Sequence, residues 1–161
     1  METNRTHSLR AQLIAFALVL APMAFGHAVS LHDAKLFDLV KFQRFDLASL
    51  KGKKFLVVFF QLDCPPCREQ LRALNCLKEK LPSVEIIAAG VGEPKELGKE
   101  AKRLGLKYPA LESTPKFQEM VDGVSSTPMT LFVDEKGMIV QREDGTRTCE
   151  AWETLAKQKK L

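Results

Sequence analysis

A run of six apolar residues that leads into a pair of cysteines constrains the fold of this chain most. Phe55-Leu-Val-Val-Phe-Phe60 is short and uniformly apolar, which is typical of a strand buried on both faces in the centre of a sheet. Cys64-Pro-Pro-Cys67 follows, and after it the sequence predicts a helix that runs to about Leu81, where Pro82 ends it. The motif therefore lies between a central strand and a helix, with Cys64 at the helix N-terminus.

This position favours redox chemistry at the two cysteines. Unpaired N–H groups and the helix dipole at a helix N-terminus stabilise a thiolate, so Cys64 is placed to ionise. Cys67 lies one turn further on, near enough to close a disulfide with it. Pro65 and Pro66 suit the first turn, where backbone N–H groups have no partner within the helix. The motif predicts a redox-active dithiol.

Two structural interpretations of the motif compete with this one. A zinc knuckle needs four ligands, but the chain has no second C-x-x-C and no histidine near the first. A purely structural disulfide across one helical turn closes so small a loop that it would stabilise the fold little. The redox-active dithiol fits better than either.

The rest of the chain predicts a single α/β domain in which strands alternate with helices. Further strands are expected at 84–91, 108–111, 129–133 and 138–142, and residues 36–47 suggest a short hairpin. Helices are expected from Pro94 to Gly105, after Ser113 or Thr114, and at the end of the chain after Gly145. The 161 residues leave room for one such domain and contain no internal repeat.

A second feature of interest is Thr127-Pro128, directly before the expected strand at 129–133. A proline there suits either the start of a strand or a cis peptide bond. Without the cysteine motif, base rates would favour an ordinary trans turn.

The beginning of the chain has the three parts of a secretory signal peptide. A basic start is followed by the apolar run Ala11–Ala21, then by Pro22 and the small residues Ala24, Gly26 and Ala28. We predict a signal peptide over residues 1–28; an uncleaved membrane anchor over residues 11–29 is the alternative. Both place residues 29–161 outside the cytoplasm, as in the periplasm, where cysteines can be oxidised.

Composition excludes several classes of function. The three histidines are His7, His27 and His32, so the body of the chain has no imidazole for a Ser-His or Cys-His pair, a general base or a histidine-bound metal. The net charge of +4 arises from 24 basic and 20 acidic residues that alternate along the chain. No basic stripe with interleaved aromatic residues is present, which argues against a nucleic-acid partner.

Five ordered segments resemble the TlpA/ResA group of thioredoxin-like proteins. They are Ser49–Lys53, the apolar strand Phe55–Phe60, the CPPC motif, Val84–Glu93 and Ser126–Val140, and the resemblance extends over residues 36–161. It implies a thioredoxin fold with an inserted αβ element between the active-site helix and the cis-proline strand. It also implies thiol–disulfide exchange outside the cytoplasmic membrane, without a cofactor.

The resemblance assigns roles to five residues. Cys64 would attack and Cys67 would resolve; Thr127–Pro128 would form a cis bond facing the disulfide, and Glu93 would be an active-site acid near the dithiol. It implies reduction of a disulfide in an exported protein, with electrons supplied by an upstream thiol protein. Substrates of the group are apocytochrome thiols in cytochrome c biogenesis, a copper-enzyme assembly factor or another exported cysteine protein.

The chain departs from the family pattern at three positions, and for this reason no substrate is carried over. Asp63 replaces the tryptophan usual before the first cysteine, Gln70 replaces an acid found in ResA-like members, and Thr127 replaces a bulky aliphatic residue. We expect Asp63 to disfavour the Cys64 thiolate and Arg68 to favour it, so that both modulate the site.

Two other functions on the same fold are alternatives. A copper-delivery or assembly protein would use a C-x-x-x-C spacing and a distant histidine, whereas this chain has C-x-x-C and no histidine after His32. A peroxidase would need Thr and Arg around a single peroxidatic cysteine, and Pro-Pro-Cys after Cys64 fits that arrangement poorly.

The remaining cysteines, Cys76 and Cys149, are predicted not to form a disulfide. On a helical wheel Cys76 lies about 140° from Leu71, away from the buried face. It is also about 18 Å along the helix from Cys64, whereas Cys149 is expected to begin the last helix at the active-site end of the sheet. A disulfide needs Cα atoms within roughly 7 Å.

Overall fold

The computed structural model describes residues 29–161, and the predicted signal peptide over residues 1–28 lies outside them. Seven strands form one sheet in the order β2-β1-β5-β4-β3-β6-β7. The strands are β1 Lys35–Asp38, β2 Gln43–Asp46, β3 Phe55–Gln61, β4 Glu85–Val91, β5 Ala110–Glu112, β6 Met129–Val133 and β7 Ile139–Asp144. The helices are α1 Pro65–Lys80, α2 Pro94–Arg103, α3 Pro115–Met120 and α4 Cys149–Lys159, with 3₁₀ turns at Leu31–Asp33 and Leu47–Leu50.

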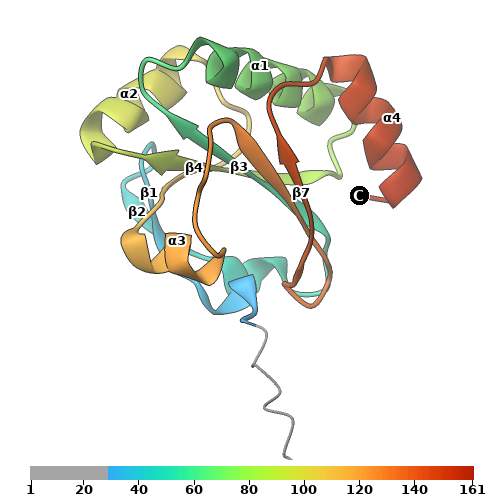
Figure 1. Ribbon diagram of the computed structural model, residues 1–161, viewed down its shortest axis with the longest axis horizontal. Helices are drawn as coiled ribbons and strands as arrows, with labels where there is room; N and C mark the ends of the chain where they lie inside the picture. Colours follow the sequence, from blue (N-terminus) through green and yellow to red (C-terminus); the bar gives the residue numbers. More distant parts are fainter. Residues whose placement is uncertain (1–28) are drawn as a thin grey trace, which may run out of the picture.

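The central position of β3 is confirmed. It pairs in parallel with β4 and antiparallel with β6, and all six residues of Phe55–Phe60 are buried. Alternate side chains serve two cores: Leu56, Val58 and Phe60 belong to the core that includes side chains of α1, α2 and α4. Phe55, Val57 and Phe59 belong to the core on the other face, beneath α3 and the 3₁₀ turns (Figure 1). Both faces of the strand are covered, so neither needs polar side chains.

The expected insertion is also present. After β4 the chain forms α2 and β5 before it reaches α3 and β6. β5 pairs in parallel with β4 and joins the sheet to β1. The insertion places α2 beside α1, on the face of the sheet that carries the cysteine motif (Figure 1).

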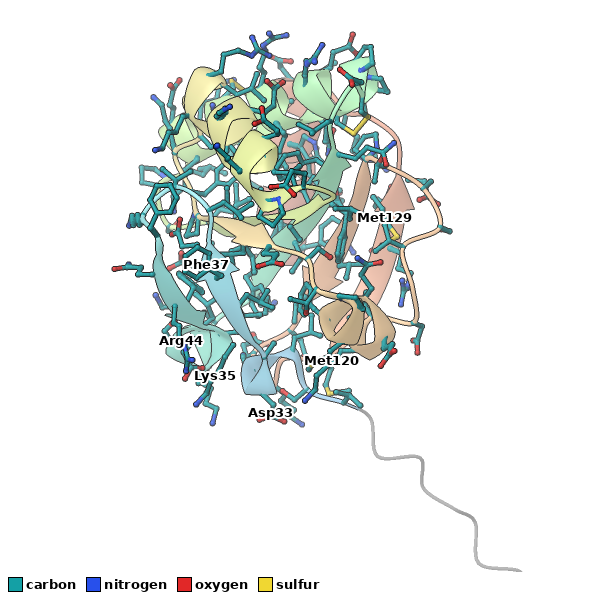
Figure 2. The ribbon with its side chains drawn as sticks, turned by 90° about the vertical axis from the view of Figure 1, so that its left-hand side faces the viewer. Asp33, Lys35, Phe37, Arg44, Met120 and Met129 are labelled. Carbon is teal, nitrogen blue, oxygen red and sulfur yellow. A yellow bond between two sulfur atoms is a disulfide. The ribbon has the colours of Figure 1, made fainter. Side chains whose placement is uncertain are left out.

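The hairpin suggested at 36–47 is formed by β1 and β2 at one edge of the sheet. Lys35 pairs with Asp46 and Phe37 pairs with Arg44 along its register. Figure 2 shows the side chains of Lys35, Phe37 and Arg44 on the outer surface of this hairpin. No helix within residues 29–161 is long and apolar enough to cross a membrane.

The prediction that Cys76 and Cys149 stay unbonded is wrong. They form a disulfide with their Cα atoms 5.8 Å apart. Gly145 lies at the active-site end, where its N–H donates to Pro128 O, but the next residues run along α1 before α4 begins. The Arg147 backbone N–H donates to the side chain of Gln70, which lies one turn beyond the motif on α1. Cys149 therefore starts α4 beside the second half of α1, and α4 packs along the flank that the wheel assigned to solvent (Figure 1).

Candidate active site

The parallel strands β3, β4 and β5 have their C-terminal ends at the same end of the sheet, and the cysteines lie there. β3 leads through Asp63, in the left-handed region at φ +52°, into Cys64, which is the N-cap of α1. Pro65 and Pro66 carry no N–H, so the Cys67 amide is the first free donor of the helix. It donates to Cys64 Sγ over 3.2 Å. The helix N-terminus thus directs its first available N–H at this sulfur, which stabilises negative charge there.

The two cysteines form a disulfide with a Cα–Cα distance of 5.2 Å. Cys64 is 6% exposed and Cys67 is 1% exposed. Cys64 is thus the more exposed cysteine of the pair, and disulfide exchange needs an accessible sulfur.

The loop before β6 covers the other side of the disulfide. The Thr127–Pro128 peptide bond is cis, as the resemblance implied. Cys64 Sγ lies 3.7 Å from the Thr127 carbonyl oxygen and 3.9 Å from Thr127 Oγ1. The sequence-predicted residues Cys64, Cys67, Thr127 and Pro128 are therefore brought together at one end of the central strand.

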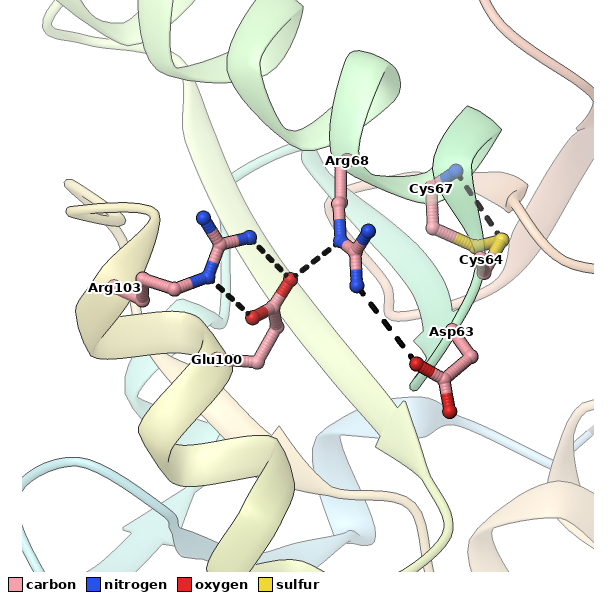
Figure 3. A network of polar contacts seen from close by, with 6 residues as sticks. All are labelled: Asp63, Cys64, Cys67, Arg68, Glu100 and Arg103. Carbon is pink, nitrogen blue, oxygen red and sulfur yellow. Dashed lines mark hydrogen bonds and ion pairs between the residues drawn. A yellow bond between two sulfur atoms is a disulfide. The ribbon is translucent and has the colours of Figure 1, made fainter.

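Asp63 and Arg68 belong to a chain of ion pairs that joins the cysteine loop to α2 (Figure 3). Arg68 Nη2 lies 4.0 Å from Asp63 Oδ1, and Arg68 Nε donates to Glu100 Oε1 over 2.8 Å. Arg103 donates to both carboxylate oxygens of Glu100, at 2.7 Å each. No role was predicted for Glu100, because it lies 32 residues from Arg68 and only the packing of α2 beside α1 brings them together.

The two arginines lower the pKa of Glu100 from 4.5 to about 2, chiefly through the Arg103 hydrogen bonds. Partial burial opposes this shift, and Arg68 adds to it. Glu100 is therefore ionised at neutral pH and is a fixed negative charge beside the site.

Glu93 lies at the end of β4 and caps α2. Its Oε1 accepts the Lys95 backbone N–H at 3.2 Å, and its side chain is exposed. No hydrogen bond within residues 29–161 joins Glu93 to either cysteine. Its role as an active-site acid stays a prediction.

Gln70 is a buried polar residue that hydrogen-bonds three other residues, a structural role that was not predicted from the sequence. It is fully buried one turn beyond Cys67; its Nε2 donates to Thr130 Oγ1, and its Oε1 accepts the Arg147 backbone N–H and the Trp152 indole N–H. The side chain therefore links α1 to β6 and to α4. A polar residue on the apolar face of an amphipathic helix was the signal that could have revealed it.

No group of three His, Cys, Asp or Glu side chains that could hold a metal ion occurs in the described part of the chain. His32 is the one histidine within residues 29–161, and its ring lies 6.0 Å from that of Phe55. Phe55 begins β3 and the cysteines follow its end, so His32 and the dithiol lie at opposite ends of the strand.

Comparison with known proteins agrees with this geometry. The profile of the AhpC/TSA family matches residues 29–142. Thiol-disulfide oxidoreductase ResA of Geobacillus kaustophilus (strain HTA426) is 33% identical over 121 residues, which cover 73% of this chain and 69% of that protein. ResA of Bacillus subtilis (strain 168) is 31% identical over 109 residues, which cover 66% of this chain and 61% of that protein.

Solved structures show the same fold at lower identity. A secreted disulfide oxidoreductase of Mycobacterium tuberculosis, described as homologous to E. coli DsbE, has a TM-score of 0.67 at 17% identity and covers 78% of this chain and 96% of its own. Peroxiredoxin Q of Xanthomonas campestris has a TM-score of 0.66 at 14% identity, with 79% and 91% covered. Proteins with different names share this fold, so the fold alone does not decide the activity. The profile and the more similar relatives place the chain in the AhpC/TSA family and, within it, among the TlpA/ResA-type thioredoxin-like thiol–disulfide oxidoreductases.

Proposed function

We propose that the protein acts outside the cytoplasm and reduces disulfides in exported proteins, with Cys64 as the attacking thiol and Cys67 as the resolving thiol. The observation that carries the proposal is the hydrogen bond that the Cys67 backbone N–H donates to Sγ of Cys64, the more exposed cysteine of the pair, at the start of α1. Thr127 and Pro128 would form the wall against which a substrate disulfide docks. Glu93 is proposed as an accessory acid only by family resemblance.

The reaction proceeds by two exchanges. The Cys64 thiolate attacks one sulfur of the substrate disulfide, and the displaced sulfur leaves as a thiolate that takes up a proton. The Cys67 thiol then loses its proton and attacks Cys64 Sγ, which releases the second substrate thiol. The substrate gains two electrons and two protons, and the protein is left with the Cys64–Cys67 disulfide seen in the structure. An upstream dithiol protein must reduce this disulfide before the next cycle.

Two observations support the location and the direction. The Cys76–Cys149 disulfide lies outside the C-x-x-C motif, and such disulfides persist in oxidising compartments. Asp63 directly precedes Cys64, and a negative charge near a cysteine disfavours the thiolate, as suits a reducing site. The proposed substrate is a disulfide-containing exported protein, with cytochrome c biogenesis as one setting.

The place of His32 argues against the copper-delivery alternative. A copper site on this fold would need a histidine close to the cysteines. His32 is buried at the far end of β3, and the sequence has no later histidine.

Trapping in the native cell tests the proposal. Cys67→Ser in the full chain should accumulate mixed disulfides through Cys64, whereas Cys64→Ser should trap few. In the reduced wild-type protein, alkylation near neutral pH should label Cys64 before Cys67. Equal labelling, or mixed disulfides through Cys67, would contradict the assignment.

A further inference from the structure

The groove between the start of α1 and α2 is lined by Asp63, the residue before Cys64, and by other charged side chains whose charges cancel. Its acids and bases are Asp63, Arg68, Glu96, Lys99, Glu100 and Arg103. On the other side of Cys64 the loop before β6 presents the uncharged Thr127. The charged side chains of the groove therefore come from the cysteine loop, α1 and α2, and Glu93, at the end of β4, is exposed and caps α2.

Arg68 is the basic side chain of this groove that α1 itself supplies, four residues after Cys64. It is bound at its Nε by Glu100 over 2.8 Å, whereas its distance to Asp63 is 4.0 Å. The stronger contact therefore draws the guanidinium toward α2 and away from the cysteine loop (Figure 3).

Glu100 is the fixed end of this arrangement. Its side chain is 13% exposed and receives two further hydrogen bonds from Arg103, while the side chain of Asp63 is fully exposed. A carboxylate held by two guanidinium groups stays in place, and a solvated one moves freely. Glu100 therefore decides where the positive charge of Arg68 lies.

We propose that Glu100 is a positioning residue for the thiol chemistry: it binds Arg68 on the α2 side, withholds this positive charge from the Cys64 thiolate and so keeps the dithiol reducing. The proposal rests on the proposed function and names the residue that tunes it. Removal of the Glu100 charge has two effects of the same sign. The groove gains a net positive charge, and Arg68 is free to approach Asp63 and Cys64; both stabilise the thiolate.

The test is the pH dependence of Cys64 alkylation in the full chain, followed by mass spectrometry of the peptide that contains Cys64. Glu100→Gln keeps the shape of the side chain but removes the charge that holds Arg68, and it should lower the pKa of Cys64 by about half a unit or more. Arg68→Gln should raise that pKa. Since Glu100 acts through Arg68, Glu100→Gln should shift the pKa less than half as much in the Arg68→Gln background.

Matched variants separate this role from a structural one. Glu96→Gln removes the same charge from the same helix and groove, but Glu96 is paired with Lys99, so its effect should be less than half that of Glu100→Gln. Glu100→Asp retains the charge, so the pKa of Cys64 should stay near its wild-type value. This variant tests the role of the charge even if Glu100→Gln folds poorly.

Three results would overturn the proposal: no shift in Glu100→Gln, an equal shift with and without Arg68, or an equal shift in Glu96→Gln. The measurement needs no partner protein. If trapping failed while these shifts appeared, the proposed function would be wrong and the positioning role would stand.

Discussion

Asp63 and Cys64 are neighbours in the chain but face different surroundings. The left-handed backbone at Asp63 turns its carboxylate into solvent, where it lies near Arg68. The Cys64 side chain turns inward and lies against the Cys67 amide and Thr127. Water and Arg68 both screen the carboxylate, so the backbone amide is the closest stabilising group of the thiolate.

Asp63→Asn should lower the pKa of Cys64 by a few tenths of a unit and make the disulfide more oxidising. The reason is the loss of a negative charge next to the thiolate, moderated by solvent. Thiol titration of the full chain and equilibration with glutathione measure the two effects. Asp122→Asn, another exposed carboxylate that also lies near an arginine, is the control and should change neither. An unchanged or higher pKa in Asp63→Asn would mean that the carboxylate has no influence on Cys64.

Gln70→Leu should destabilise the protein by about 3 kcal/mol, because two buried polar groups and one partly buried group lose a partner, and an unpaired buried group costs about 1–3 kcal/mol. The groups are the hydroxyl of Thr130, the backbone N–H of Arg147 and the indole N–H of Trp152. Urea unfolding measures the loss. Gln158→Leu, on the exposed side of α4, is the matched control and should stay within about 0.5 kcal/mol of wild type. Equal stability of the two variants would show that Gln70 is not a structural link.

At the scale of elements, α1 and α4 are joined by more than apolar packing. Cys76 and Cys149 connect them covalently, and Lys80 at the end of α1 pairs with Glu150 and Glu153 of α4. The ion pairs are largely solvated, so they contribute little, and the pKa of Glu153 is lowered chiefly by Lys157, then by Lys80. The disulfide therefore contributes more to this junction than the ion pairs do.

The double variant Cys76→Ser/Cys149→Ser should lose about 4 kcal/mol of unfolding free energy, because its disulfide closes a long loop with a sequence separation of 73. Cys64→Ser/Cys67→Ser is the control: it also removes one disulfide, but the sequence separation is 3, so little stability should be lost. Denaturant unfolding compares the two. Peptide mapping of the oxidised protein should recover the 76–149 disulfide, and its absence would contradict the structure.

At the scale of the whole molecule, paired carboxylates couple stability to acid pH. The pKa of Glu100 is lowered to about 2, and that of Glu143 is lowered chiefly by its hydrogen bond with Arg147. The Glu100–Arg68 pair joins α2 to α1, whereas the Glu143–Arg147 pair is local, four residues apart. A carboxyl with a lowered pKa stabilises the folded state where it is ionised in both states, and this stabilisation disappears as it is protonated.

The contribution of Glu100 to the free energy of unfolding should therefore be constant above about pH 5. It should be lost as the pH decreases from 4.5 towards 2. Glu100→Gln should flatten this part of the profile, because it has no carboxyl to protonate. Thermal unfolding between pH 2 and pH 7 measures the slope. Glu96→Gln should retain more of the wild-type slope; an identical slope in wild type and Glu100→Gln would show that Glu100 does not contribute.

Local patterns were sufficient for most of the fold. The apolar run at Phe55–Phe60 predicted a central strand, Pro94 predicted where α2 begins, and Ser113 or Thr114 predicted where α3 begins. The C-x-x-C spacing predicted the disulfide at the start of α1. These features are local because burial on both faces, helix capping and a one-turn disulfide depend on residues a few positions apart.

Contacts between distant segments were decided by the tertiary structure alone. Cys149 reaches Cys76 because residues 145–148 run along α1 before α4 begins, and Glu100 reaches Arg68 because the inserted helix packs beside the active-site helix. Gln70 joins three elements for the same reason. Periodicity tells which face of a helix is buried but not which element covers it, so the sequence by itself determined the dithiol and its helix, and packing decided the groups around them.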